Sequence, residues 1–385
     1  MADVELIEDA RAVEPLRAEW DALAVAAGQP LTTPAWMLSW WRHVAPAGAE
    51  LRLITVRGRR RELIGVLPFF VVDSGSRRLR VMADDFSAVA APLAYPDRLW
   101  EVAEAAAHLL SEPDLRPDAL DLGPIHAGWP WATAFRERWP ARIRPLAYRR
   151  DLLSNPVVSL RHPDFASWLA ERRSHFRSNV RRRRRRFEQE GGTYRLATAE
   201  TLAEDVRTFA ALHTARWAGL GSSRLAELGP RLPLLLEEVA ADLIAQERFR
   251  LFVLEVDGQP IAAELVLAAG GEVVSVNTGW DERFRHLHPA TLGLIRVIED
   301  GIERGDRRLD LGWGRLDYKA PFADGAETVV WDTLLAPGSG LARTLPRALP
   351  DIADRRLRQS VKRALSEERF QQLKSRLHGH LRHIR

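Results

Sequence analysis

One arrangement of strands and a helix occurs twice along this chain of 385 residues, and it limits the folds that the chain can adopt. Residues 52–72 and 250–269 each have the pattern of two apolar strands joined by a turn, with Asp257-Gly258 at the second turn. Each hairpin is followed by another apolar stretch, by a helix with apolar residues three or four positions apart, and by a short strand with the triplet Asp-Leu-Gly. This shared order predicts two related lobes. The matched segments are 78–84 and 272–280, 98–112 and 291–305, and 119–125 and 308–314.

The second half of the chain carries the fuller set of elements. A strand over 193–198 and helices over 199–217 and 231–248 precede its hairpin, and a strand over 327–335 follows the repeated segments. Consecutive antiparallel strands followed by a helix and a strand predict an α/β fold, in which a mixed sheet has helices on both faces. The expected division is an N-terminal lobe, a C-terminal lobe and a helical tail: residues 1–150, 151–337 and 338–385.

The length and composition fit a two-domain protein with two hydrophobic cores. The chain has no cysteine, which excludes disulfides, a thiolate nucleophile and any metal site with cysteine ligands. The acidic N-terminus lacks a signal-peptide pattern, and the longest apolar run, residues 63–72, is well below the ~20 residues that span a bilayer. We therefore expect a cytoplasmic protein, with a position at the inner face of the membrane left open.

Positive charge is concentrated in two segments, although the formal net charge of the chain is only +4. Residues 171–186 contain nine arginines and one acid, and residues 351–385 contain ten basic residues and four acids. Phe176, Val180 and Phe187 recur at helical spacing, which places the run Arg181–Arg186 on an amphipathic helix. This helix binds phosphates if it faces a cleft, and it is a solvated face if it does not.

Several motifs resemble a known family of transferases. The segments FRSNVRRRRRRFEQEGG, LHTARW, GQPIAAELVL, HPATLGL and DLGWGRLDYKAPF, taken in order, resemble the CelD-type, BioF-like acetyltransferases of the GNAT superfamily. The N-terminal segments TTPAWMLSWWRHV and ELIGVLPFF are similar to the same group. The family is in turn similar to the Fem-type peptidyltransferases, which have two GNAT-like lobes. The resemblance covers about residues 10–335.

The resemblance implies acyl transfer from a donor such as acetyl-CoA to an amine. A CoA donor needs backbone N–H groups at a helix N-terminus to hold its pyrophosphate. The matching segment gives the expected donor-binding residues Pro289, Ala290, Thr291, Leu292 and Gly293, and an ordinary helix start is the alternative. The corresponding segment of the first half, residues 84–100, has no glycine and two prolines. We therefore expect the N-terminal lobe to be degenerate.

Four residues are candidates for the chemistry. Tyr318 could protonate the leaving group, and Lys319 could contact a donor phosphate or the carbonyl oxygen that becomes negative during attack. Only three of the 56 basic residues are lysines, so a lysine in this loop suggests a specific need for an ammonium group. Asp317 and Glu264 are the carboxylates expected to accept the proton of the amine. Glu264 lies within an apolar strand, where it is either a base with a raised pKa or a paired structural group.

Three residues at the end of one predicted helix are candidates for substrate binding. His213, Arg216 and Trp217 lie one turn apart and could share a face toward the cleft. The alternative is that Trp217 packs in the core and Arg216 caps the helix. The spacing of the histidines does not support a metal site, so we expect none. The sequence also lacks the nucleophile elbow, the phosphate loop and the dinucleotide fingerprint.

Three functions remain open from the sequence. The first is a CoA-dependent N-acyltransferase that acts on an amine of a small molecule, a sugar or a peptide. The second is a Fem-like transferase that uses aminoacyl-tRNA, and the third is a non-catalytic GNAT scaffold in the assembly of envelope polysaccharide. Arg181–Arg186 and the basic tail could bind tRNA or an anionic surface. Apolar residues at helical spacing over 357–384 predict that the tail is an amphipathic helix, which docks on the body or on a partner.

Overall fold

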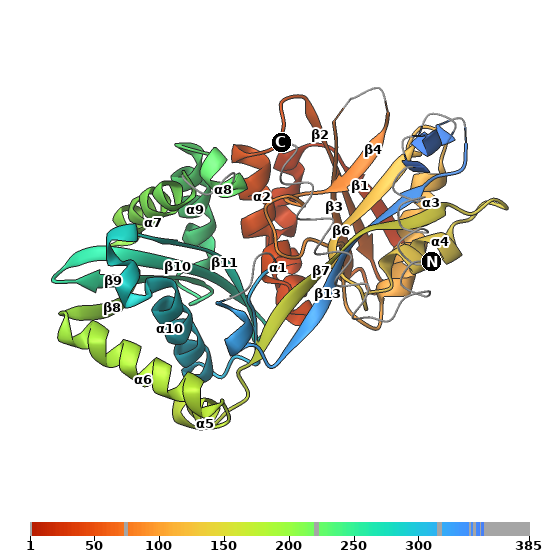
Figure 1. The fold of residues 1–385 in the computed structure, drawn as a ribbon. Helices are drawn as coiled ribbons and strands as arrows, with labels where there is room; N and C mark the ends of the chain where they lie inside the picture. Colours follow the sequence, from red (N-terminus) through yellow and green to blue (C-terminus); the bar gives the residue numbers. More distant parts are fainter. Residues whose placement is uncertain are drawn as a thin grey trace.

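The computed structural model describes residues 2–72, 76–218, 223–313, 318–338, 340–341, 344–346 and 348–349, without the side chain of Asp151. These residues form one mixed sheet of 13 strands with helices on both faces, which confirms the predicted α/β class. Figure 1 shows the two halves of this sheet side by side, each with its own helices. Asp317 and the predicted tail helix over 357–384 lie outside the described residues.

The N-terminal lobe contains the first six strands and four α-helices. Thr33 Oγ1 accepts a hydrogen bond from the backbone N–H of Trp36, which caps α2 and fixes where this helix begins. α1 and α2 lie between the two halves of the sheet, where α2 packs against α9 of the C-terminal lobe. The elements are β1 (Asp3–Ile7), α1 (Arg17–Ala27), η2 (Pro30–Thr32), α2 (Pro34–His43), β2 (Ala49–Arg57), β3 (Leu63–Val72), β4 (Arg78–Val81), β5 (Leu93–Ala94), α3 (Leu99–Ser111), β6 (Ala119–His126) and α4 (Trp131–Arg138).

The C-terminal lobe repeats this order of elements. α7 approaches β11 so closely at Gly279 that a β carbon there would lie 2.4 Å from the backbone nitrogen of His213. The elements are α5 (Phe165–Ala170), α6 (Ser174–Gln189), β8 (Gly192–Leu196), α7 (Leu202–Trp217), α8 (Arg224–Glu227), α9 (Arg231–Leu243), β9 (Phe249–Val256), β10 (Gln259–Ala269), β11 (Glu272–Trp280), η3 (Glu282–Leu287), α10 (Pro289–Glu303), β12 (Arg308–Asp310) and η4 (Ala320–Phe322).

The pairing of the strands confirms the predicted duplication. In the N-terminal lobe β2, β3 and β4 pair antiparallel, α3 follows, and β6 then pairs parallel with β4. In the C-terminal lobe β9, β10 and β11 pair antiparallel, α10 follows, and β12 pairs parallel with β11. Because the same connection is made twice, the two lobes are tandem copies of one topology.

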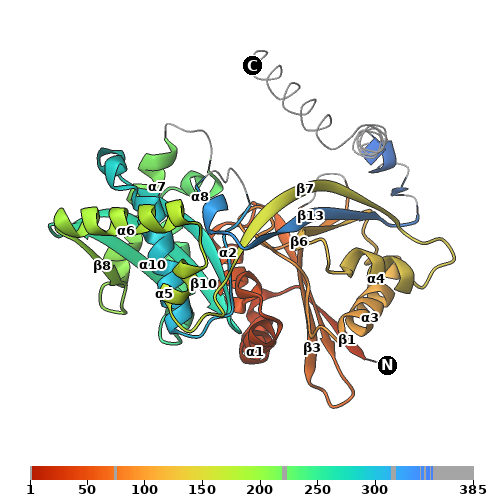
Figure 2. The same ribbon diagram turned by 60° about the horizontal axis from the view of Figure 1, so that its bottom comes forward.

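Two long strands join the lobes. β7 (Leu146–Ser159) begins in the N-terminal lobe, and its last three residues pair with β12. β13 (Gly325–Leu335) lies between β6 and β7 and pairs antiparallel with both. Figure 2 shows β7 and β13 running together away from the junction. The sequence analysis did not identify β7, because its polar residues interrupt the alternation that marks a strand.

Other differences from the prediction are elements that were not predicted, such as β1, α1, α2 and α4, and the ends of helices. The helix predicted over 231–248 ends at Leu243, and Glu247 in the following turn has a positive φ of 57°. No helix in the described ranges combines the length and the apolar composition needed to cross a membrane.

Candidate active site

The parallel strands β11 and β12 separate beside the start of α10. They are paired from Glu272 with Arg308 to Val274 with Asp310, where β12 ends. β11 continues to Trp280 and is held there only on its other edge, by β10, among the described residues. In an open α/β sheet, ligands bind beyond the carboxyl ends of the strands, and this opening is such a position.

Glu264 is buried beside this opening, with only 4% of its surface exposed. It lies on β10 and faces α10, where a β carbon on Gly293 would lie 3.5 Å from Glu264 Cβ. Ser275 Oγ of β11 donates a hydrogen bond of 2.7 Å to Glu264 Oε1. Burial raises the pKa of Glu264 to about 7, although Ser275 and Lys319 partly oppose the rise. A carboxylate with this pKa can accept and release a proton near neutral pH.

Lys319 lies on the β12 side of the opening. Its Nζ donates a hydrogen bond to the backbone oxygen of Leu311, the residue directly after β12. Burial lowers the pKa of Lys319, while the carboxylates of Glu264 and Asp310 act against this change. Tyr318 is 38% exposed, and its ring centre lies 5.9 Å from Lys319 Nζ. Asp317, the fourth predicted catalytic residue, lies outside the described residues.

Aromatic packing fixes the segment that carries Lys319. Phe322 at the end of η4 is buried, with its ring centre 5.0 Å from that of Phe176 on α6 and 6.5 Å from that of Trp168 on α5. These contacts tie η4 to two helices of the C-terminal lobe. Lys319 directly precedes η4, so the same packing limits the positions that its side chain can reach.

The first turn of α10 contains the predicted donor-binding residues. His288 precedes the helix with a positive φ of 57°, and Pro289 occupies the first position. The backbone N–H groups of Thr291 and Leu292, which we expected to be free, both donate to the backbone oxygen of His288. The N–H of Ala290 has no acceptor among the described residues. The number of free N–H groups is therefore smaller than the sequence analysis expected.

Arginines of α6 surround the start of α10. Arg183 Nη1 lies 3.4 Å from Thr291 Oγ1, and Arg183 Nε is buried without a partner in the described part of the chain. Burial, and then the charge of Arg182, lowers the pKa of Arg183. Burial and then the charges of Arg183, Arg182 and Arg186 lower the pKa of His288. Arg186 pairs with Glu190, whereas Arg182 and Arg183 have no carboxylate partner among the described residues. Their positive charge adds to the helix dipole, and both favour an anion at this position.

The arginine run divides between two sides of α6. Val180 and Phe187 are buried, and Arg183 and Arg184 lie three and four residues after Val180 on the same side. Arg184 Nη2 lies 3.1 Å from Glu299 Oε1 of α10. Arg181, Arg182, Arg185 and Arg186 are exposed. The sequence analysis named the run Arg181–Arg186 as a whole and did not single out Arg183, although its spacing from Val180 and Phe187 marks it as facing inward.

The three predicted substrate-binding residues pack around the far end of β11. His213 is fully buried, with ring nitrogens 3.1 Å from the backbone oxygen of Thr278 and 2.9 Å from Ser223 Oγ. Arg216 Nη1 lies 2.8 Å from Glu282 Oε1, and its guanidinium lies 4.5 Å from the ring centre of Trp280. The ring centres of Trp217 and His213 are 6.2 Å apart. In the described ranges, no group of His, Asp and Glu side chains could hold a metal ion.

Residues 174–320 match the family model described as "Acetyltransferase (GNAT) domain". The structure of FemX is similar with a TM-score of 0.58 at 11% identity, over 88% of this chain and 99% of that one. L-PGS from Bacillus licheniformis is similar with a TM-score of 0.52 at 13% identity, over 88% of this chain and 95% of that one. No curated protein sequence matches the chain. The family match and the duplicated topology support the GNAT superfamily, with tandem lobes of the GNAT acyltransferase fold.

Proposed function

We propose that this protein is an N-acyltransferase of the CelD-type, BioF-like group, and that it transfers an acyl group from acyl-CoA to an amine. The observation that carries the proposal is the position of Glu264, a buried carboxyl with a pKa of about 7, next to the start of α10 and the opening between β11 and β12. A buried carboxyl of this kind costs stability, and this cost favours a catalytic role over a scaffold.

Bound acyl-CoA would supply an activated thioester carbonyl. In the proposed reaction the nitrogen of the amine attacks the carbonyl carbon and forms the amide bond, and Glu264 accepts a proton from this nitrogen. Lys319 stabilises the negative charge on the carbonyl oxygen during the attack. Tyr318 donates a proton to the sulfur as the carbon–sulfur bond breaks. The products are the amide and the free thiol, and both side chains return to their first protonation state by proton exchange with solvent.

The charges at α10 fit a donor that carries phosphates. Among the described residues, one guanidinium nitrogen of Arg183 at the first turn of the helix and the backbone N–H of Ala290 have no hydrogen-bond partner. Arg182 and Arg186 add positive charge close to His288. These groups compensate for the few glycines of the segment, because side chains supply donors that a glycine-rich turn supplies from its backbone.

A calorimetric titration with acetyl-CoA tests the donor. We expect saturable binding that weakens about tenfold in Lys319→Ala and in Arg183→Ala. Arg181→Ala, on the exposed side of the same helix, is the matched control and changes the affinity less than threefold. Absence of saturable binding by the wild-type protein would refute the CoA donor. Equal effects of Arg183→Ala and Arg181→Ala would refute the proposed role of Arg183.

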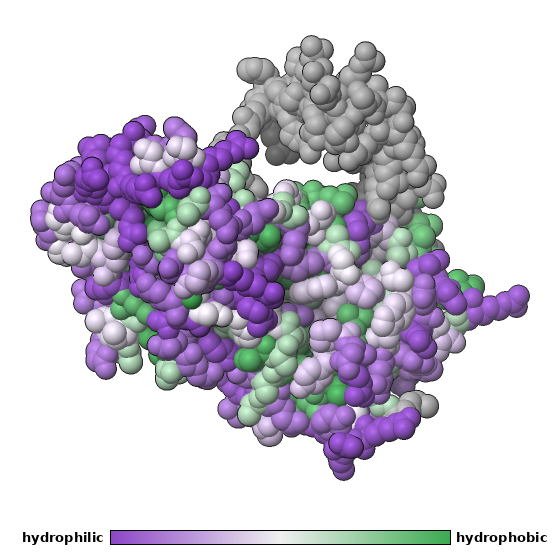
Figure 3. Space-filling view, turned by 90° about the horizontal axis from the view of Figure 1, so that it is seen from below, coloured by the Kyte–Doolittle hydropathy of each residue, from purple (hydrophilic) through white to green (hydrophobic). Residues whose placement is uncertain are grey.

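The exposed arginines favour a second candidate, a Fem-like transferase that uses aminoacyl-tRNA. Arg181 and Arg185 are exposed and lie one turn apart along α6, with the half-buried Arg177 one turn before them. No carboxylate pairs with these three arginines among the described residues. Figure 3 shows hydrophilic residues crowded over this part of the surface, at the upper left. Binding of charged tRNA with a steep inverse dependence on salt, in a protein that does not bind acetyl-CoA, would support this candidate.

A further inference from the structure

A second hollow lies where the two lobes meet, on the sheet face away from α10. Val274 and Asp310 line it, whereas their neighbours Val273 and Leu309 pack with residues of α10 on the opposite face. Its volume is about 620 Å³. The end of α1, η2 and the residues after β6 form its N-terminal walls, and the first residues of β11, β12 and β13 form its C-terminal walls. Both lobes are therefore needed to build this cavity.

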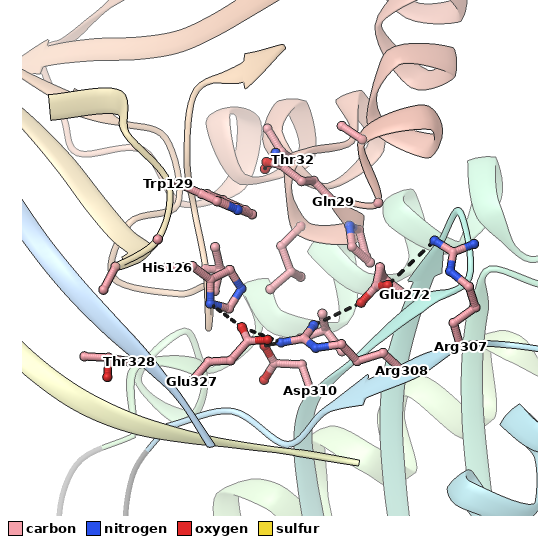
Figure 4. A pocket seen from close by; sticks show the side chains of 18 of the residues that line it. Gln29, Thr32, His126, Trp129, Glu272, Arg307, Arg308, Asp310, Glu327 and Thr328 are labelled. Carbon is pink, nitrogen blue, oxygen red and sulfur yellow. Dashed lines mark hydrogen bonds and ion pairs between the residues drawn. The ribbon is translucent and has the colours of Figure 1, made fainter. Parts of the chain in front are cut away.

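Charged groups in the cavity are paired with one another. Arg308 Nη1 lies 3.0 Å from Glu272 Oε2, and Arg308 Nη2 lies 2.8 Å from Glu327 Oε2. His126 Nδ1 lies 2.8 Å from the same oxygen of Glu327, and Arg307 lies 3.7 Å from Glu272 Oε1. Figure 4 shows these pairs as a connected row along the floor of the cavity. With Asp310, three carboxylates face two guanidinium groups, so the arginines give the lining no excess of positive charge.

Uncharged polar groups and one aromatic ring complete the walls. Gln29 and Thr32 come from the N-terminal lobe, and Thr328 comes from β13. Trp129 lies beside His126 in the wall, and the two rings pack edge-to-face with their centres 4.8 Å apart. Arg308 Nε is buried and has no hydrogen-bond partner among the described residues. An aromatic face with donors and acceptors around it suits a ligand that has both hydroxyl groups and an apolar face.

The cavity borders the proposed reaction site. Val274 and Asp310 form the last pair before β11 and β12 separate, and both line the cavity. Asp310 Oδ1 accepts a hydrogen bond of 2.7 Å from the backbone N–H of Gly312, next to the oxygen of Leu311 that Lys319 contacts. The carboxylate of Asp310 also acts on the charge of Lys319. A molecule in the cavity therefore lies next to the opening between β11 and β12, on the face of the sheet opposite α10.

We propose that this cavity binds the acceptor as a small amine that carries hydroxyl or amide groups and no phosphate. This proposal rests on the proposed acyl transfer. The charges of the two sites favour different substrates. Arg182 and Arg183, which have no carboxylate partner in the described ranges, attract a phosphate-bearing donor to α10, whereas the balanced lining of the cavity does not attract a second phosphate. The ammonium form of an amine is favoured beside Glu327 and Trp129.

Saturation-transfer NMR with two matched probes tests this proposal without the donor. Glucosamine carries the amine and the hydroxyl groups, and glucosamine 6-phosphate differs from it by one phosphate. We expect glucosamine to bind with a dissociation constant in the millimolar range, at least about tenfold more tightly than glucosamine 6-phosphate. Lack of glucosamine binding, or equal or tighter binding of the phosphate, would overturn the proposal.

Two variants locate the binding. Trp129→Ala should weaken glucosamine binding about tenfold, because the ligand loses its aromatic contact. Glu327→Gln should weaken the binding of glucosamine and strengthen the binding of glucosamine 6-phosphate. The ratio of the two affinities should therefore fall about fivefold. Glu137→Gln, an exposed carboxylate on α4, is the matched control and should leave both affinities unchanged. Equal affinities in Trp129→Ala and the wild-type protein would place the ligand elsewhere and refute the assignment.

One further variant and one further measurement distinguish failure of the acceptor assignment from failure of the proposed function. Gln29→Ala removes a polar wall without touching the row of ion pairs, so it replaces Trp129→Ala if that variant fails to fold in circular dichroism. Binding of acetyl-CoA is measured on the same samples. If the wild-type protein binds acetyl-CoA but not glucosamine, the acceptor assignment alone is refuted. If the wild-type protein does not bind acetyl-CoA, the proposed function is refuted.

Discussion

Ser275 Oγ donates a hydrogen bond of 2.7 Å to Glu264 Oε1 in a part of the sheet that is closed to solvent. This bond favours the charged form of the carboxyl and opposes the effect of burial on its pKa. If ionised Glu264 is the base, kcat/KM rises with pH around pH 7. Ser275→Ala removes the bond, so this rise should move to higher pH by about one unit. Ser275→Thr keeps a hydroxyl and should keep the profile, and identical profiles for the wild type and Ser275→Ala would contradict the assignment.

Replacement of Glu264 itself should separate catalysis from binding. Glu264→Gln keeps the size of the side chain but cannot accept the proton, so kcat should fall about 100- to 1,000-fold. The affinity for acetyl-CoA should change little, because the proposed donor contacts come from α6, α10 and Lys319. Glu188→Gln, an exposed carboxylate on α6, serves as the control in the same assay. Full activity of Glu264→Gln would exclude this carboxyl as the base.

The same carboxyl makes stability depend on pH. Burial raises the pKa of Glu264 from 4.5 to about 7, so the folded state favours the protonated form. Its contribution to the free energy of unfolding is therefore present below about pH 4.5 and is lost as the pH rises to about 7, a cost of up to about 3 kcal/mol at pH 8. Glu264→Gln lacks this group, so its unfolding free energy in urea should fall less between pH 5 and pH 8 than that of the wild type. Equal falls in the two proteins would show that the carboxyl is not buried.

Two glycines of the C-terminal lobe provide a matched pair for stability. A β carbon on Gly279 would lie 2.4 Å from the backbone nitrogen of His213, whereas one on Gly293 would make an ordinary contact at 3.5 Å. Gly279→Ala should lower the unfolding free energy by about 2 kcal/mol or more, because α7 must move away from β11. Gly293→Ala should be neutral or stabilising by up to about 1 kcal/mol, because alanine favours the helix. Urea unfolding of both variants tests the packing of α7.

Local sequence patterns predicted the repeated elements of the two lobes, but contacts between distant segments could not be read from them. The hairpins, α10 and the short strand β12 follow from apolar spacing and turn residues. The place of β13 between β6 and β7 depends on which edges are open in the folded sheet, and no local pattern records this. The row that joins His126, Arg308 and Glu327 unites three strands from both halves of the chain.

The candidate site shows the same division. Glu264 was recognisable as an acid in an apolar strand, and Lys319 as a rare lysine in a chain that uses arginine. Ser275 was not, because a serine in a strand gives no signal until its partner across the strand is known. The free N–H groups expected at Thr291 and Leu292 are bonded, since the backbone oxygen of His288 accepts from both.

The position of β13 also bears on how the protein is made. Within the described chain β6 pairs only with β4 and β13, so its second edge stays open until residues 325–335 have been synthesised. An unpaired edge strand is prone to associate with other chains. The sheet of the first half is therefore complete only after residues 325–335 have left the ribosome, and a fragment ending at residue 150 would keep that edge exposed.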